Sequence, residues 1–278
     1  RVGVYFNIAH NENKITEMPD NYIEENYTFG NGNYAYRREE GRPMGSFYGY
    51  RYKGVYQNKD ATYARDIEGN VMKDISGNAI VMRNGSYTVA PGDAIYEDVN
   101  HDGVINQYDI VYLGNSNPRL TGGAGLNVSY KQFKLSAIFY GRYGQDVVNA
   151  TRLNNESMRG IDNQSTAVLR RWRNEGDQTD IPRALYGEGY NTLGSDRFVE
   201  DASYLRLKSL SFTYRLPKKA IQRWGFNNID VYVTGYNLFT WTNYTGQDPE
   251  VKTENTYAKD TATTPASIQL GAGFNLSF

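Results

Sequence analysis

The sequence predicts an all-β fold, a transmembrane antiparallel β-barrel with long extracellular loops. The chain ends on strict alternation, in which small or polar residues separate Ile268, Leu270, Ala272, Phe274, Leu276 and Phe278. A period of two places these sets on opposite faces of a strand, and about 11 residues let a tilted strand cross a bilayer. The chain also lacks any apolar run of about 18 residues, so it predicts no transmembrane helix.

The N-terminal half contains three predicted strands. Residues 2–8 alternate between apolar and polar positions, and residues 33–39 form a weaker candidate that leads into the turn residues 41–43. Residues 46–55 are rich in tyrosine and read as a third strand. The polar, Gly-, Asn- and Asp-rich stretch that follows predicts a long connection.

The C-terminal half contains five more predicted strands. Residues 124–130 and 133–139 alternate on either side of Lys131-Gln132, which predicts a hairpin. The sixth strand, 204–216, is ended by Pro217, which cannot donate to a sheet. The seventh and eighth strands are 229–241 and 268–278.

If the C-terminus is periplasmic, counting the predicted strands back from it assigns each connection to one side of the membrane. The short connectors 41–43, 131–132 and 218–228 fall on the periplasmic side, and the long connections fall outside. Residues 57–121 and 142–202 are therefore predicted to be long extracellular loops. A soluble β-sandwich would also alternate, but loops of this length are uncommon in it.

The predicted strands contain too many small residues for a narrow barrel. Gly123, Gly125, Gly271 and Gly273 fall on the polar face, where an eight-stranded barrel needs side chains to fill its interior. The eight strands are therefore predicted to be the last part of a larger barrel, whose other strands precede Arg1.

Composition excludes several functions. The net charge of -1 gives no field for nucleic acid, and the absence of cysteine excludes disulfides and thiolate metal sites. The 25 tyrosines suit a membrane interface and also sugar or peptide binding. Only His10 and His101 are histidines, and no nucleophile or phosphate-loop motif is present. The chain is therefore predicted to be neither an enzyme nor an organic-cofactor protein.

One loop follows the spacing of a calcium site. Oxygen-bearing side chains stand at positions 1, 3, 5 and 9, Gly103 allows a sharp turn, and position 7 offers a backbone carbonyl. The predicted ligands are Asp98, Asn100, Asp102, Val104 (through its carbonyl), Asn106 and Asp109. Asp109 replaces the usual bidentate Glu, and no flanking helices are evident. A structural Ca²⁺ (or Mg²⁺) is expected, and a metal-free Asx-rich turn is the alternative.

Several segments together resemble one family. In order along the chain they are 41–50, 92–106, 113–118, 127–133, 180–183, 199–208, 236–240 and the terminal Phe278. The chain resembles the C-terminal part of SusC/RagA-family TonB-dependent outer-membrane transporters of Bacteroidota. The resemblance implies a barrel of about 22 strands embedded in outer-membrane lipid. It also implies a SusD-like surface lipoprotein, a TonB complex, and import of oligosaccharides or peptides. The family's plug domain and TonB-binding segment precede the barrel and are not in this chain.

Under this resemblance, the loops would seat the SusD-like partner and form one side of the substrate cavity. Aromatic rings that could stack on sugars, and one arginine, are the candidate contacts: Trp172, Arg183, Tyr186, Tyr190, Trp241 and Tyr244. The alternative for each is the aromatic girdle or the partner interface.

Two other functions stay open. A calcium-dependent extracellular binding or adhesin module would use the Asp98–Asp109 loop and would fold alone. A passive porin would conduct without an energy-coupling partner.

Overall fold

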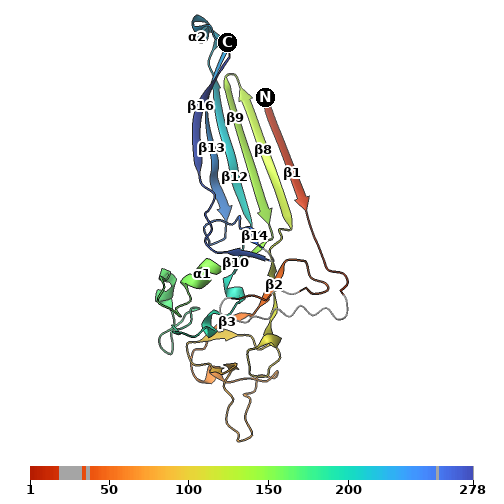
Figure 1. The fold of residues 1–278 in the computed structure, drawn as a ribbon, viewed down its shortest axis with the longest axis vertical. Coiled ribbons are helices and arrows are strands. Elements are labelled where there is room, and N and C mark those ends of the chain that lie inside the picture. Colours follow the sequence, from red (N-terminus) through yellow and green to blue (C-terminus); the bar gives the residue numbers. More distant parts are fainter. Residues whose placement is uncertain (19–32, 36–37, 255–256, 278) are drawn as a thin grey trace.

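The computed structural model describes residues 1–18, 33–35, 38–254 and 257–277, which form a long antiparallel wall with a domain at one end (Figure 1). The wall has six strands in this part of the chain, in the order β1-β8-β9-β12-β13-β16. They are β1 (Val2–His10), β8 (Leu120–Tyr130), β9 (Phe133–Tyr143), β12 (Tyr204–Arg215), β13 (Asn228–Thr242) and β16 (Gln269–Ser277). This confirms the predicted antiparallel barrel wall. The predicted terminal Phe278 lies outside the described residues.

Register aligns the apolar positions of all six strands on one face of the wall. Phe212 of β12 pairs with Leu135 of β9 and with Val233 of β13, and Val233 pairs with Ala272 of β16. The first two strands continue the band, because Val2 of β1 pairs with Val128 of β8. Many of these side chains are exposed in the chain, as a surface that faces lipid requires.

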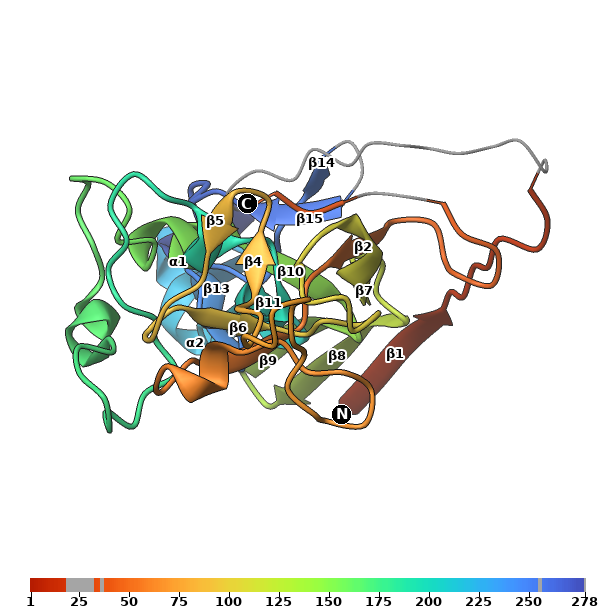
Figure 2. The same cartoon turned by 90° about the horizontal axis from the view of Figure 1, so that it is seen from below.

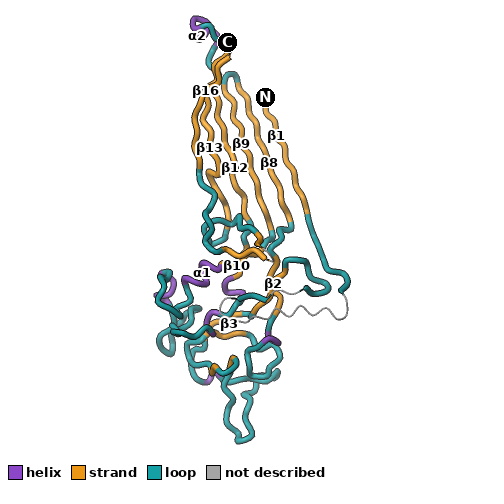
Figure 3. The backbone as a smooth tube through the Cα atoms, in the orientation of Figure 1, coloured by secondary structure: helices purple, strands orange, loops and turns teal. Residues whose placement is uncertain are grey.

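Short turns join the strands at the end opposite the domain. Lys131 and Gln132 connect β8 to β9, and residues 216–227, with helices α2 and η6, connect β12 to β13. The three long connections, 11–119, 144–203 and 243–268, all leave from the other end, where loops predominate (Figure 3). Their described residues are called the loop domain below. Seen from that end, it covers the end of the wall (Figure 2).

The loop domain contains short strands and short helices. Its strands are β2 (Ser46–Gly49), β3 (Tyr52–Val55), β4 (Arg83–Asn84), β5 (Tyr87–Thr88), β6 (Ala94–Tyr96), β7 (Val111–Asn115), β10 (Asp146–Asn149), β11 (Val199–Asp201), β14 (Thr253–Glu254) and β15 (Tyr257–Asp260). The helices of the described chain are α1 (Ala150–Asn155), α2 (Lys218–Ile221), η1 (Asp60–Thr62), η2 (Gln107–Asp109), η3 (Thr166–Arg170), η4 (Tyr190–Thr192), η5 (Asp196–Phe198) and η6 (Gln222–Trp224). Among the residues described, none of these helices has the length and apolarity to cross a membrane.

Two predicted strands do not join the wall. Ala35 forms an isolated bridge with Tyr48, and residues 46–55 split into β2 and β3, which pair with β7 and β6 inside the loop domain. Residues 36 and 37 of the first candidate lie outside the described residues. The turn 41–43 therefore lies in the loop domain and is not a periplasmic connector. The predicted loop 57–121 lies within the single connection 11–119 except for its last two residues, which begin β8. The described core of this connection is built from tyrosines and aliphatic side chains.

The cross-strand partners of two inner-face glycines explain why glycine occurs at these positions. Gly125 pairs with Tyr5, and Gly273 pairs with Tyr232. A Cβ at either glycine would collide with the partner's phenol ring. These glycines accommodate tyrosine rings that lie across the neighbouring strand, so they do not by themselves measure the width of the barrel.

Arginine at position 233 is expected to destabilise the barrel far more than arginine at position 234. Val233 lies on the lipid-facing band between Phe212 and Ala272, whereas Thr234 faces inward between Ser211 and Gly271. Val233→Arg should cost about 2–4 kcal/mol if it lies near the bilayer midplane, because a guanidinium is poorly solvated by hydrocarbon. Folding titrations of the complete receptor into lipid vesicles measure both variants. Equal losses would contradict the assigned faces.

Candidate functional site at the mouth of the barrel

Five polar side chains gather on the inner face where the wall meets the loop domain. Tyr140 and Arg142 come from β9, and Tyr204, Arg206 and Lys208 come from β12. Arg142 is directly opposite Tyr204, and Tyr140 is directly opposite Arg206. These five residues are called the mouth cluster below. They alternate with lipid-facing residues such as Phe139 and Leu205, which assigns them to the lumen.

A bulge in β12 at Lys208 brings this last residue of the mouth cluster to the inner face. The pairing of β12 with both neighbours shifts between Leu207 and Ser209. Lys208 is the extra residue against β9, whereas two residues of β13, Asn237 and Leu238, stand opposite it. Lipid-facing positions are odd-numbered before the bulge, as at Leu205, and even-numbered after it, as at Phe212. A bulge bends a strand and redirects its side chains. Here it leaves Lys208 on the same side as Arg206.

Arg206 fastens the last long connection to the wall. Its Nη2 donates to Asp248 Oδ1 at 2.5 Å, its Nη1 to Glu250 Oε2 at 2.8 Å and its Nε to Thr240 Oγ1 at 2.8 Å. Lys208 Nζ donates to the same Glu250 oxygen at 2.8 Å. Arg206 is only 3% exposed, so its charge depends on these two carboxylates for compensation.

Asp248 is held in its ionised form. Burial alone would raise its pKa, but the N–H groups of Ala266 and Glu250 and the Arg206 guanidinium donate to it and together hold that pKa below its ordinary value. The carboxylate therefore ties Arg206 of the wall to two points of the connection 243–268.

A cavity of about 640 Å³ lies beside this ion-pair cluster. Arg142 contributes a cation to the lining of this cavity. Asp248 and Glu250 contribute the carboxylates that pair with Arg206, and Lys252 and Asp260 contribute further charge. Polar side chains and ionisable groups of both signs converge here, which is the pattern of a polar binding site.

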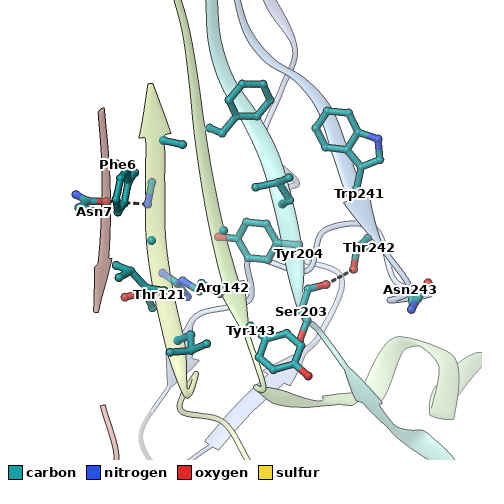
Figure 4. A pocket seen from close by; sticks show the side chains of 18 residues that line it. Phe6, Asn7, Thr121, Arg142, Tyr143, Ser203, Tyr204, Trp241, Thr242 and Asn243 are labelled. Atoms are coloured by element: carbon teal, nitrogen blue, oxygen red, sulfur yellow. Dashed lines mark hydrogen bonds between the residues drawn. The ribbon is translucent and has the colours of Figure 1, made fainter. Parts of the chain in front are cut away.

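A second hollow has a different character. A groove of about 720 Å³ is lined by Gly122, Gly141 and Phe139, together with Phe6 and Trp241, which Figure 4 labels. Gly122 and Gly141 are directly paired and belong to the lipid-facing band. Its apolar lining therefore belongs to the surface that contacts lipid, although Arg142 and Tyr204 also line the groove.

The six predicted substrate or partner residues do not converge on one site. Trp241 is half exposed on the lipid-facing side, next to Phe139 and Phe239, as the girdle alternative expects. Trp172 is buried against Gly92, where a Cβ would collide with the indole. Tyr186 is 78% exposed in the loop domain and so can still meet a partner.

The other three residues build the loop domain. Arg183 pairs with the fully buried Asp93, with Nε donating to Oδ1 at 2.7 Å. Tyr190 is 2% exposed and packs against the rings of Tyr87 and Tyr96. Tyr244 is also buried, and its hydroxyl donates to Asp260 at 2.6 Å. These contacts give the three side chains structural roles.

Much of the tyrosine content is explained by this packing. Tyr34, Tyr52 and Tyr96 donate their hydroxyls to backbone carbonyls of distant segments, at 2.7, 2.6 and 3.0 Å. Burial raises the pKa of Tyr56 to about 12, and burial also raises the pKa of Tyr96 well above its ordinary value. Tyrosine lets a loop-rich domain bury area while still satisfying backbone carbonyls.

The predicted calcium loop forms a tight turn. Asp98 Oδ2 accepts from Gly103 N–H at 2.8 Å, Asp102 Oδ1 accepts from Val104 N–H at 2.8 Å, and Asn106 Oδ1 caps η2 by accepting from Tyr108 N–H. Asn100 reaches Asp102 through its amide at 2.9 Å. Gly103 has a φ of +80°, and a Cβ there would lie 2.9 Å from Ala64 Cβ.

Asp109 has a separate role at the end of this loop. It is fully buried, and its two oxygens accept the N–H groups of Val99 and Asn106 at 2.8 Å each. Burial raises its pKa, against the effect of these hydrogen bonds. Within the described ranges, no three His, Cys, Asp or Glu side chains gather as a metal site. Calcium binding at Asp98–Asn106, with or without Asp109, stays a prediction.

The mouth cluster was not predicted from the sequence. Arg206 and Lys208 do alternate with Leu205 and Leu207, so their inward orientation could have been inferred from period two. Their shared partner Glu250 lies about 40 residues later in a polar connection, and alternation carries no information about that pairing.

The architecture defines the class of protein: a segment of a transmembrane β-barrel with a large domain at one end. Its relatives include TonB-dependent receptor P3 of Formosa agariphila, 33% identical over 257 residues, which cover 90% of this chain and 23% of the relative. TonB-dependent receptor P26 of the same organism is 30% identical over 248 residues, which cover 87% of this chain and 23% of that relative.

Solved structures agree with these relatives. A chain in a structure of the RagAB peptide transporter matches 100% of this chain and 27% of its own length, with a TM-score of 0.71 and 26% identity. A chain of the RagAB peptide importer in the "closed-closed" state matches with a TM-score of 0.69 and 25% identity. No protein-family model matches the chain.

The chain belongs to the SusC/RagA family of TonB-dependent receptors, as the resemblance predicted. It spans about a quarter of the length of the relatives it matches. These relatives are receptors and transporters, which confirms the prediction that the chain is not an enzyme.

Removing Arg206 is expected to release the last connection from the wall. Arg206→Met leaves Asp248 without its cation and Glu250 with Lys208 alone. The expected cost lies toward the lower end of about 3–5 kcal/mol, because both carboxylates keep some contact with water. Hydrogen exchange should accelerate across residues 247–266 of the complete receptor. Lys208→Met is the matched control and should cost under about 1 kcal/mol, because Arg206 still holds Glu250.

The same connection should loosen in acid. The folded-state pKa of Asp248 lies below its unfolded value, so its stabilisation is present above about pH 4 and is lost as the pH falls further. Hydrogen exchange across residues 247–266 at falling pH measures this loss.

The role of Arg206 would be contradicted if Arg206→Met left hydrogen exchange in this connection unchanged. It would also be contradicted if exchange rose equally in Arg206→Met and Lys208→Met.

Calcium is expected to protect the Asp98–Asn106 loop. Millimolar Ca²⁺, the range of weak extracellular sites, should slow hydrogen exchange across residues 98–106. The turns at Asp66 and Asp74 are internal controls, because each uses one carboxylate to accept backbone N–H groups in a similar way. Asp102→Asn should abolish the effect. No change in protection at residues 98–106 would refute the calcium prediction.

Proposed function

We propose that the complete receptor imports oligosaccharides or peptides across the outer membrane of a Bacteroidota-type cell, driven by a TonB complex. The observation that carries the proposal is the match of the whole chain to the RagAB peptide transporter, at 26% identity and a TM-score of 0.71. The receptors from Formosa agariphila support the TonB-dependent class independently through sequence.

In this proposal, the chain supplies barrel wall and the substrate-facing mouth. The lipid-facing band anchors the wall in outer-membrane lipid, and the opposite face lines the lumen. The mouth cluster and its cavity of about 640 Å³ lie where a substrate would pass from the loop domain into the barrel. Charged and aromatic groups there suit a polar oligomer better than a hydrophobic solute.

A SusD-like surface lipoprotein is the proposed partner of the loop domain. The long connections all leave one end of the wall, which is the extracellular end in barrels with short periplasmic turns. The loop domain leaves the side chains of Ile67, Ile75 and Tyr186 exposed by 83%, 106% and 78%. These single side chains are available for contact with a protein partner.

Uptake by the complete receptor is expected to be saturable and to depend on energy. Cells that carry it should accumulate a fluorescent oligopeptide or oligosaccharide, and a protonophore or loss of the TonB complex should abolish that accumulation. The control is a receptor without its TonB-binding segment, which leaves the barrel intact. Uptake that persists without energy would favour a passive porin instead. Calcium-dependent surface binding without uptake would favour the adhesin.

A further inference from the structure

Arg142 is the unbalanced cation of the mouth cluster. Arg206 and Lys208 share the two carboxylates Asp248 and Glu250, whereas Arg142 forms no ion pair in the described part of the chain. Its Nε donates to the Tyr140 hydroxyl at 3.2 Å, and its guanidinium lies 5.9 Å from the centre of that ring. Within the mouth cluster, the two carboxylates are thus bound by Arg206 and Lys208 and not by Arg142. The other carboxylate of the cavity lining, Asp260, forms no ion pair with Arg142 in the described part of the chain.

A buried hydroxyl lies beside this guanidinium. Tyr204 pairs directly with Arg142 across β9 and β12, so their side chains are neighbours on the inner face (Figure 4). Tyr204 is 5% exposed, and its hydroxyl has no hydrogen-bond partner among the residues described. A buried hydroxyl without a partner is costly, so its retention calls for an explanation.

The Arg142 guanidinium lies next to a cavity that can admit a ligand. Arg142 lines the cavity of about 640 Å³ together with Asp248 and Glu250, the two carboxylates that pair with Arg206. The Oε2 of Glu250 is already shared by Arg206 and Lys208. The cavity thus presents a guanidinium with spare donors, and its cross-strand neighbour Tyr204 has a hydroxyl without a partner among the residues described.

We propose that Arg142 and Tyr204 form a subsite that binds a carboxylate of the transported molecule. A guanidinium presents paired donors that match the two oxygens of a carboxylate, and the phenol can donate a further hydrogen bond to one of them. The carboxylate belongs either to a peptide terminus or acidic side chain, or to a uronic acid in an oligosaccharide. This inference rests on the proposed import function and specifies the substrate group that the mouth selects.

Binding to the purified complete receptor, with its partner present, tests the subsite. The probes are an oligopeptide with a free C-terminal carboxylate and its C-terminal amide, and an oligogalacturonate and the matching neutral galactose oligomer. The wild type should bind the acid of at least one pair more tightly, by about tenfold or more. Arg142→Gln should remove that preference, and Tyr204→Phe, which deletes only the hydroxyl, should reduce it.

Lys134→Gln is the matched control, because it removes a cation from the same inner face of β9 at the far end of the strand. It should leave the preference unchanged. Preference within the peptide pair alone or the sugar pair alone assigns the source of the carboxylate. Equal binding of acid and neutral probes to the wild type would overturn the subsite, as would a preference that survives in Arg142→Gln. Import that does not depend on energy would instead refute the proposed function, so the two failures can be told apart.

Discussion

Backbone pairing is the constraint on which the rest of the structure depends. In hydrocarbon every backbone N–H and C=O needs a partner, so strands can cross only as part of a closed sheet. Within the described chain the inner four strands of the wall are paired on both sides, while β1 and β16 are edges. Those edges require further strands for closure. This agrees with a chain that spans about a quarter of its relatives.

The same pairing determines where chemistry can occur. Once the register places Phe212, Val233 and Ala272 toward lipid, the alternate positions must face the lumen. The bulge at Lys208 is the point at which this alternation is reset, and it lies at the level where the wall meets the loop domain. Arg206 and Lys208 reach Asp248 and Glu250 there, so the irregularity in the ladder and the ion-pair cluster occur together.

Period two predicted the wall well and the loop domain poorly, for a physical reason. Wall strands such as 124–130 and 133–139 have one face in lipid, so their apolar pattern is strict and their hairpin is local in sequence. Residues 46–55 were predicted to be one strand from their tyrosines, but they form two short strands that pack on a tyrosine-rich core. Alternation reports that a strand has two different faces, and it cannot report whether lipid or protein covers the apolar one.

Aromatic and charged residues were harder to place, because their roles depend on distant partners. Trp172, Tyr190 and Tyr244 have the chemistry of sugar-stacking residues, yet burial assigns them to the loop domain. Arg142 and Tyr204 drew no attention in the sequence, because each is one polar position in an alternating strand. Their significance arises only from register, which puts a cation without a carboxylate beside a hydroxyl without a partner. A site of this kind is recognised by what its polar groups lack, and that requires knowing every neighbour.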